Sequence, residues 1–172
     1  LGGRGVALPV VQDLIASSTN RVVFGLGPTG LSVARFLHRS GERFSVVDTR
    51  PEPPCLEQLR AEMPEVAVFT GDIPESVLTG AGQLVVSPGV ALDEAHVAGA
   101  LEAGVPVLGD IDLFVGAATA PVVGITGSNA KSTVTALVGE MAKAAGLDTG
   151  VGGNLGPPAL DLLAPERELY IV

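Results

Sequence analysis

Residues 21–39 read RVVFGLGPTGLSVARFLHR, and this stretch decides the fold. Four residues typical of a β-strand lead into Gly25-Leu26-Gly27-Pro28-Thr29-Gly30, a G-x-G-x-x-G pattern, and apolar residues then recur at helical spacing. In such a strand–turn–helix unit the glycines allow a tight turn and a close approach of the backbone to a phosphate. The N-terminus of the helix then offers free N–H groups to the anion. The stretch therefore predicts a nucleotide-binding βα unit.

An acidic residue further along fits a dinucleotide. Asp48 ends the next apolar run, 18 residues after Gly30, at the place where dinucleotide-binding folds carry an acid for the ribose of NAD. One interpretation is therefore an NAD(P)-dependent oxidoreductase, with Asp48 on the ribose or Arg50 on a 2′-phosphate. Another is that the glycines only permit close packing of strand and helix.

Short Val-rich runs alternate with helical patterns on both sides of this unit. Continuous apolar strands that alternate with helices are typical of a parallel sheet covered on both faces. We therefore expect an α/β domain with a Rossmann-like parallel sheet of about five strands over residues 20–114, preceded by an N-terminal extension over residues 1–19. Strands are expected at 21–27, 44–48, 66–69, 83–87 and 106–108, and helices at 31–39, 54–62, 74–78 and 93–103.

A second α/β unit is expected over residues 121–172, after an uncharged linker at 115–120. Two or three strands with one long helix cannot cover both faces of a sheet. We therefore expect this unit to be the incomplete start of a larger domain, and completion by an oligomeric partner is the alternative. Its predicted elements are a strand at 121–126, a helix at 131–145, a Gly-rich turn at 150–156 after a short strand, a short helix at 159–163 and a strand at 168–172.

The first loop of this second unit carries another phosphate-binding pattern, GSNAKST at 127–133. Backbone N–H groups of such a P-loop wrap the phosphates, Lys131 can reach the β/γ oxygens, and Ser132 can bind magnesium. A simple Walker pattern has glycine directly before the lysine and again five residues earlier, where this chain has Ala130 and Ile125. The alternative is an ordinary Ser-rich helix start with a solvated lysine.

Three further groups follow predicted strands, at the edge where open α/β sheets bind ligands. They are Thr49 with Arg50, the turn Ser87-Pro88-Gly89, and Asn154 in the loop at 152–156. Each can hydrogen-bond phosphate or sugar oxygens, and each is also compatible with an ordinary turn or loop. His38, His96 and Cys55 have no partners at ligand or catalytic spacing, and we expect no chemical role for them.

The composition argues against several classes of protein. The 172 residues include 10 Lys+Arg and 19 Asp+Glu, a formal charge of −9, which argues against nucleic acid as a partner. Hydrophobic residues make up 47%, too many for a disordered chain. The longest uncharged stretch, 113–130, contains glycines and a proline and does not fit a membrane-spanning helix. With its single cysteine, the chain is expected to be a soluble cytoplasmic protein without a membrane partner.

Two phosphate-binding loops on consecutive α/β units, followed by GGN, make the chain resemble the Mur ligases of peptidoglycan synthesis from about residue 20 to its last residue. The stretches that carry the resemblance are GLGPTGLS at 25–32, DTR at 48–50, SPG at 87–89, GDIDLF at 109–114, ITGSNAKSTVT at 125–135 and GVGGNLG at 150–156.

The resemblance implies a monomeric ATP-dependent ligase that adds D-glutamate to UDP-N-acetylmuramoyl-L-alanine through an acyl phosphate, with magnesium as cofactor. The implied UDP-sugar residues are Gly27, Pro28, Thr29, Asp48, Thr49, Arg50, Ser87, Pro88, Gly89 and Asn154. The implied ATP residues are Gly127, Ser128, Asn129, Ala130, Lys131, Ser132 and Thr133, with Lys131 as the catalytic residue and Ser132 on the metal. Further elements that the family requires are missing from these 172 residues. We expect the chain to be truncated and to retain the UDP-sugar site with part of the ATP site, and a non-catalytic nucleotide-binding fragment is the alternative.

The family has glycine where this chain has Ala130. If that position requires a positive φ, an L-residue there costs about 1–2 kcal/mol, and its methyl group crowds a phosphate. We therefore expect ATP to bind more weakly than to an Ala130→Gly variant.

Overall fold

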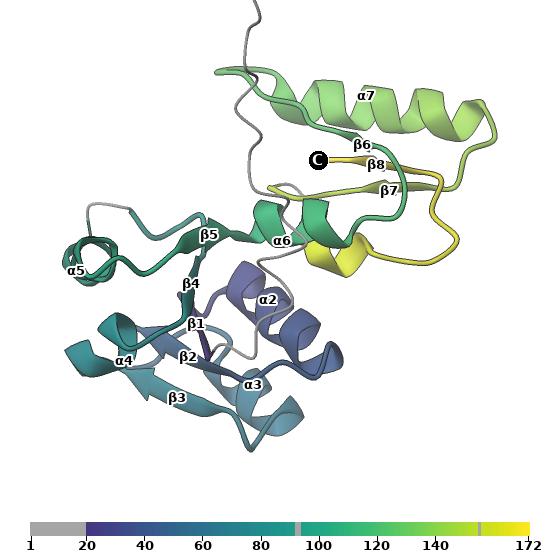
Figure 1. Cartoon of the computed structure of the whole chain (residues 1–172). Helices are drawn as coiled ribbons and strands as arrows, with labels where there is room; N and C mark the ends of the chain where they lie inside the picture. The colour runs from purple at the N-terminus through teal and green to yellow at the C-terminus, as the bar shows by residue number, and fades with distance from the viewer. Residues whose placement is uncertain (1–19, 92–93, 155) are drawn as a thin grey trace, which may run out of the picture.

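The computed structural model describes residues 20–91, 94–154 and 156–172, and these form two parallel β-sheets (Figure 1). The strand order of the first sheet is β3-β2-β1-β4-β5, and every neighbouring pair is parallel. This confirms the predicted parallel sheet of five strands. Its strands are β1 (Arg21–Phe24), β2 (Phe44–Asp48), β3 (Ala67–Thr70), β4 (Gln83–Val86) and β5 (Val107–Gly109).

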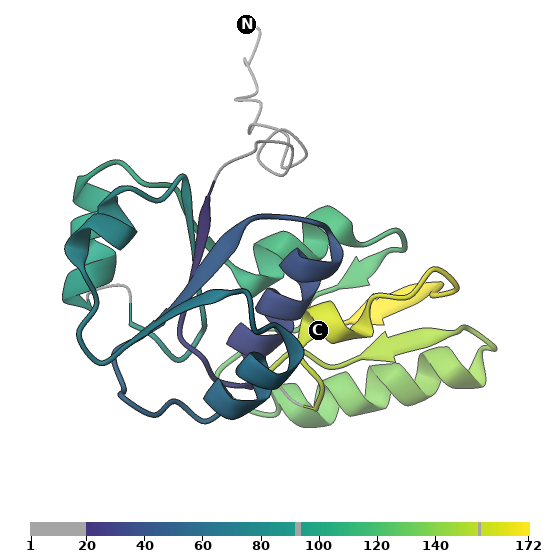
Figure 2. The same ribbon diagram turned by 90° about the horizontal axis from the view of Figure 1, so that it is seen from below.

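Helices cover both faces of the first sheet (Figures 1 and 2). Successive strand residues point to opposite faces, so Val23 and Val22 enter two different cores. The core that contains Val23 packs under α2 (Pro28–Arg39) and α3 (Leu56–Glu62), and the one that contains Val22 under α4 (Glu75–Thr79) and α5 (Ala95–Glu102). Burial on both faces explains why the strands are continuous apolar runs.

The turn between β1 and α2 depends on two of its glycines. Gly25 has a φ of +98°, in the left-handed region that favours glycine. At Gly30 a Cβ atom would lie only 1.8 Å from the carbonyl oxygen of Gly25, so only glycine lets the helix pack this closely on the turn. Helix α2 begins with Pro28, a residue favoured in the first turn, and so starts three residues before the predicted 31.

The second sheet has the order β6-β8-β7 and lies between helices (Figure 1). Helix α7 (Lys131–Ala144) packs on one face, and α6 (Asp110–Ala117) and the 3₁₀ helix η1 (Ala159–Leu162) lie on the other. The strands are β6 (Val122–Val123), β7 (Thr149–Val151) and β8 (Leu169–Ile171).

The two sheets share a hydrophobic core through α6 and η1. The Ser32 hydroxyl on α2 donates a hydrogen bond to Asp161 Oδ1 on η1 at 2.7 Å. The rings of Phe114 and Tyr170 meet edge to face, with their centroids 5.2 Å apart. The core under α2 therefore continues into the second unit, where it includes Leu113, Phe114, Ala159, Leu160, Leu162 and Tyr170.

Besides the early start of α2, several predicted boundaries differ from the structure, and the strand predicted at 21–27 ends at Phe24. Helix α6 was not predicted, and its last turn takes up residues 115–117 of the predicted linker. Its start is capped by Asp112, whose Oδ2 accepts the Gly109 N–H at 2.7 Å. The strand predicted at 121–126 is wrong in length, because only Val122 and Val123 pair with the short strand β8.

Parts of three predicted segments fall on residues outside the described ranges. The extension at 1–19, the first residue of the helix predicted at 93–103, and residue 155 of the Gly-rich turn lie outside the described residues. The division of the chain at 115–120 stays a prediction. No helix within the described ranges has the length and apolar character needed to cross a bilayer.

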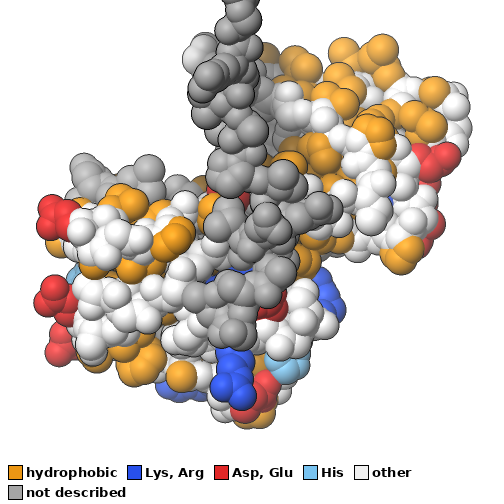
Figure 3. Space-filling view, viewed as in Figure 1, with side chains coloured by type: hydrophobic (Ala, Val, Ile, Leu, Met, Phe, Trp, Pro, Cys, Tyr) orange, Lys and Arg blue, Asp and Glu red, His pale blue; other side chains and the backbone are white. Residues whose placement is uncertain are grey.

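The outer face of α7 carries exposed apolar side chains. Val134, Leu137 and Met141 recur three and four residues apart and are 42%, 59% and 63% exposed. In Figure 3, apolar side chains gather over the part of the molecule that α7 occupies in Figure 1. Among the described residues, helix α7 is therefore covered on its sheet side and not on this outer face.

We expect a Gly30→Ala substitution to lower the free energy of unfolding by about 1–3 kcal/mol, because the new methyl group must displace the Gly25 carbonyl. Gly99→Ala is the matched control: it lies in α5 with no atom within 4 Å of the added Cβ. That change is expected to raise stability by about 0.5–1 kcal/mol. Urea denaturation of both variants measures these two changes in the free energy of unfolding. Equal changes in Gly30→Ala and Gly99→Ala would contradict the close packing at Gly30.

Candidate functional site

A cavity of about 1090 Å³ lies at the carboxyl ends of β1, β2 and β4 and extends to the loops of the second sheet. It adjoins the point where the strand order reverses between β1 and β4, which is where open α/β sheets bind ligands. The second unit contributes Gly124, Ile125, Thr126, Gly153, Asn154 and Val172 to its wall. All ten predicted UDP-sugar residues line this one cavity: Gly27, Pro28, Thr29, Asp48, Thr49, Arg50, Ser87, Pro88, Gly89 and Asn154.

The first Gly-rich loop presents bare backbone to the cavity. A Cβ at Gly27 would meet no atom within 4 Å, although the residue lines the cavity. Gly27 is also the N-cap of α2, and no side chain caps the first turn. The free N–H groups at this helix start therefore remain able to bind an anion.

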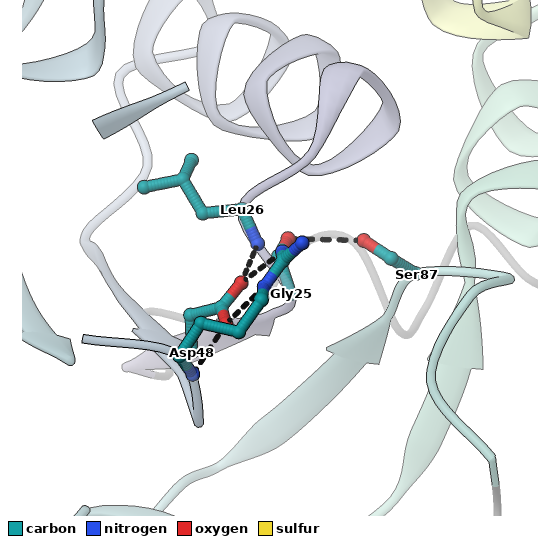
Figure 4. A network of polar contacts seen from close by, with 5 residues as sticks. Gly25, Leu26, Asp48 and Ser87 are labelled. Atoms are coloured by element: carbon teal, nitrogen blue, oxygen red, sulfur yellow. Dashed lines mark hydrogen bonds and ion pairs between the residues drawn. The ribbon is translucent and has the colours of Figure 1, made fainter. Parts of the chain in front are cut away.

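Asp48 holds this loop in place from the end of β2 (Figure 4). The backbone N–H of Leu26 donates to Asp48 Oδ2 at 2.7 Å. The Arg50 side chain donates to both carboxylate oxygens, at 2.9 Å to Oδ1 and 2.6 Å to Oδ2, and the Arg50 N–H adds a third bond at 2.9 Å.

The protonation of Asp48 follows from these contacts. Its burial, with 2% of the residue exposed, raises the pKa of the carboxyl. The hydrogen bonds from Arg50 and Leu26 outweigh that effect and hold the pKa below its usual range. Asp48 is therefore an ionised residue that joins the loop after β1 to Arg50, whose own side chain is half-exposed.

Ser87 ties the end of β4 to the same turn (Figure 4). Its hydroxyl donates to the carbonyl oxygen of Gly25 at 3.1 Å, and the residue is buried. Pro88 and Gly89 follow it and are exposed at the cavity wall. The three predicted groups at Asp48, Ser87 and Gly27 thus meet around one turn.

The loop at 127–133 lies outside the lining of this cavity and is mostly exposed. The residues just before it, Gly124–Thr126, form part of the cavity wall. Lys131 Nζ donates to the carbonyl oxygen of Gly127 at 2.5 Å, which places the ammonium group over the loop.

Ala130 adopts the left-handed backbone conformation, and this is the condition under which an alanine at this position is expected to cost free energy. Its φ is +59° and its ψ is +7°, and among the described residues it is the one non-glycine with a positive φ. The premise of the sequence-based expectation is therefore confirmed, whereas its effect on ATP stays a prediction.

The cavity is also lined by two acidic residues, Glu94 and Asp110. Neither was predicted from the sequence as a site residue. Glu94 caps α5 and accepts from the His96 N–H at 2.9 Å, and its other oxygen lies 2.8 Å from the His96 ring. Burial raises the pKa of Glu94, but the bonds with His96 outweigh this and the pKa is lowered.

Asp110 follows β5 directly and is 6% exposed. Burial raises its pKa, two N–H groups at the start of α6 oppose this, and the charge of Asp112 adds to the increase. An acid two residues after the strand predicted at 106–108, in GDIDLF, was the sequence feature that would have identified it.

We expect Asp48→Asn to lower the free energy of unfolding by about 1–3 kcal/mol at neutral pH, because the charge-assisted bonds are lost. The folded-state pKa of Asp48 is depressed, so its stabilisation is present above the usual pKa of aspartate and is lost as pH falls through the lowered value. Urea denaturation at a series of pH values should therefore show the two proteins converging in acid. The exposed Asp72→Asn serves as the control, and a difference that persists in acid would contradict this role.

Comparison with known proteins gives consistent relatives. Residues 19–109 match the family model described as Mur ligase MurD-like, N-terminal domain. A UDP-N-acetylmuramoylalanine–D-glutamate ligase of Pseudomonas aeruginosa is 55% identical over 161 residues, and one of Marinobacter nauticus is 50% identical over the same length. Both alignments cover 94% of this chain and 36% of the relative, so the chain spans about a third of the length of these relatives.

Solved structures with the same fold are also found. A pseudomurein peptide ligase type C from Methanothermus fervidus matches with a TM-score of 0.54 at 22% identity, over 90% of this chain and 32% of that one. The UDP-N-acetylmuramate:L-alanyl-gamma-D-glutamyl-meso-diaminopimelate ligase from Neisseria meningitides matches with a TM-score of 0.51 at 20% identity, over 90% of this chain and 52% of that one. These two support the α/β fold, and the sequence matches show that the chain belongs to the family of MurD-like Mur ligases.

Proposed function

We propose that the cavity between the two sheets binds UDP-N-acetylmuramoyl-L-alanine, and that the chain serves an ATP-dependent ligase which adds D-glutamate to it in peptidoglycan synthesis. The observation that carries this proposal is the convergence of all ten UDP-sugar residues on one cavity. The residues come from four separate loops, so their meeting is a property of the fold and not of one motif. Family membership and the names of the relatives support the same substrate.

For each part of the proposed ligand, the cavity is lined by residues of suitable chemistry. The diphosphate would lie at Gly27, Pro28 and Thr29, where the first turn of α2 offers its N–H groups. The uracil and ribose would lie at Thr49 and Arg50, beyond the end of β2. The muramoyl part would lie toward Asn154, in the second unit.

The geometry of Asp48 disfavours the oxidoreductase alternative. A dinucleotide site needs this carboxylate for the ribose hydroxyls. Here both oxygens accept hydrogen bonds from Leu26 and Arg50 within the protein. We infer that Asp48 acts on the UDP part indirectly, by holding the loop and Arg50.

The loop at 127–133 is proposed to bind the phosphates of ATP. Lys131 lies over this loop and would offset charge on the γ-phosphate as the alanyl carboxylate attacks it. ADP leaves and an acyl phosphate forms. The amine of D-glutamate then attacks the activated carbonyl, inorganic phosphate leaves, and the amide bond is made. The chain's own contribution is to hold the carboxylate and the phosphates in line.

Magnesium fits the start of α7 with one protein ligand. Ser132 is the second residue of this helix and is exposed, and Mg²⁺ in nucleotide sites takes most of its ligands from phosphates and water. When bound, the ion would withdraw charge from the phosphates. Within the described ranges no three His, Cys, Asp or Glu side chains cluster as a metal site. A cytoplasmic monomer completes the proposal, as the resemblance implies.

Gly27→Ala tests the cavity. The added methyl group meets no protein atom, so the fold should be kept, but it occupies the place proposed for the diphosphate. We expect titration calorimetry to show binding of UDP-N-acetylmuramoyl-L-alanine to the unchanged chain and at least about tenfold weaker binding to the variant. Gly99→Ala, which does not line the cavity, should bind like the unchanged chain.

The same titration separates the alternatives. Tight binding of NAD without binding of the UDP-sugar would overturn the proposal in favour of an oxidoreductase. Binding of the UDP-sugar without any affinity for ATP would favour a non-catalytic nucleotide-binding module.

Ala130→Gly tests the second loop. Glycine adopts the observed φ of +59° without steric cost, so the variant should be more stable by about 1 kcal/mol. Removal of the methyl group should also tighten ATP binding. Thermal unfolding measures the change in stability, and ATP titration measures the change in affinity. Ala136→Gly, in the exposed middle of α7, is the control and should lower the stability instead. Equal ATP affinities for the unchanged chain and Ala130→Gly would refute the expected crowding.

A further inference from the structure

Asp110 stands out among the polar residues of the cavity. It lines the cavity, and only 6% of the residue is exposed to solvent. Asp48 and Glu94 also line the cavity, but each is engaged with a basic side chain, Arg50 or His96. Asp110 has no side-chain partner among the described residues, and only the backbone N–H groups at the start of its own helix, at Asp110 and Ile111, favour its charged form.

The ionised form of the Asp110 carboxylate is unfavourable in the folded protein. Burial and the neighbouring charge of Asp112 raise its pKa, so the ionised form is disfavoured in the folded state and reduces stability at neutral pH. The start of α6 is already capped by Asp112, which accepts the Gly109 N–H. A buried carboxylate that opposes stability and faces a ligand cavity is typical of a functional residue.

The strand order shows which part of a ligand lies near Asp110. Neighbouring strands are about 4.8 Å apart, and the cavity loops follow β2, β1, β4 and β5 in that spatial order. Asp110 follows β5, so it lies about 10 Å across the sheet edge from the phosphate loop after β1 and about 14 Å from Arg50 after β2. A nucleoside diphosphate sugar with its base at Arg50 and its phosphates at Gly27 then extends its sugar toward Asp110.

The charge of Asp110 selects among the groups of that ligand. An ionised carboxylate accepts hydrogen bonds and repels phosphates and other carboxylates. The groups that fit are the hydroxyls of the sugar. We propose that Asp110 is the residue that accepts hydrogen bonds from the sugar hydroxyls of the nucleotide-sugar and so positions the sugar between the two units. This inference rests on the proposed function and adds to it a residue for the sugar part.

The test compares two ligands on the whole 172-residue chain. Titration calorimetry with UDP and with UDP-N-acetylmuramoyl-L-alanine separates contacts to the nucleotide from contacts to the sugar. We expect Asp110→Ala to weaken binding of the UDP-sugar by about 10- to 100-fold, the range expected for a hydrogen bond to a charged group. Binding of UDP should stay within about twofold.

Two further variants make the result specific. Asp112→Asn removes the same charge two residues away, at an exposed position outside the cavity lining, and should leave both affinities unchanged. Asp110→Asn keeps the shape of the side chain and should weaken only the UDP-sugar, while its thermal unfolding midpoint stays equal to or above that of the unchanged chain. A midpoint that falls in Asp110→Asn would assign the residue to the fold instead.

The outcomes distinguish this inference from the proposed function. Equal losses for UDP and the UDP-sugar in Asp110→Ala, or no loss for either, would overturn the role of Asp110 while the cavity keeps its ligand. A loss that appears only with magnesium present would assign Asp110 to a metal bound by the diphosphate, and would also overturn the sugar contact. If the unchanged chain binds neither ligand, the proposed function fails and the inference with it.

Discussion

The close approach of Gly30 to the carbonyl oxygen of Gly25 is the constraint on which this structure depends. It sets how α2 leaves the first sheet. The same carbonyl accepts the Ser87 hydroxyl, and the next amide, that of Leu26, donates to Asp48. One turn after β1 is therefore bonded to the ends of both β4 and β2. Because the cavity loops extend from these three strand ends, a change at this turn alters all of them together.

Much of the fold could be predicted from local sequence. The strands were predicted from continuous Val-rich apolar runs, and the helices between them from apolar residues at helical spacing. The end of β1 was not predicted, because the expected strand at 21–27 continued through the turn glycines, whereas β1 ends at Phe24. Helix α6 was not predicted, because its apolar pattern is short and is explained only by the element that it packs against. That partner, η1, begins only at Ala159, whereas α6 ends at Ala117. Contacts at such separation leave no local periodic pattern.

The candidate site was predictable for a related reason. Its ten residues directly follow strands or sit in glycine loops, so topology alone brings them to one edge. What the sequence did not show is which polar atoms are already occupied. Asp48 has both oxygens engaged by its neighbours, whereas Asp110 has no such side-chain partner in the described part of the chain. At Ala130 the sequence raised a positive φ only as a condition, and the structure shows that the condition is met.

The core that α2 shares with α6, η1 and β8 has a consequence for how the polypeptide can be divided. The segment that matches the family model ends at residue 109, whereas the apolar core under α2 continues to Tyr170. A polypeptide cut at that boundary would expose to water the face of α2 that α6 and η1 cover. The segment that matches the family model is therefore shorter than the stretch of chain that encloses its hydrophobic core.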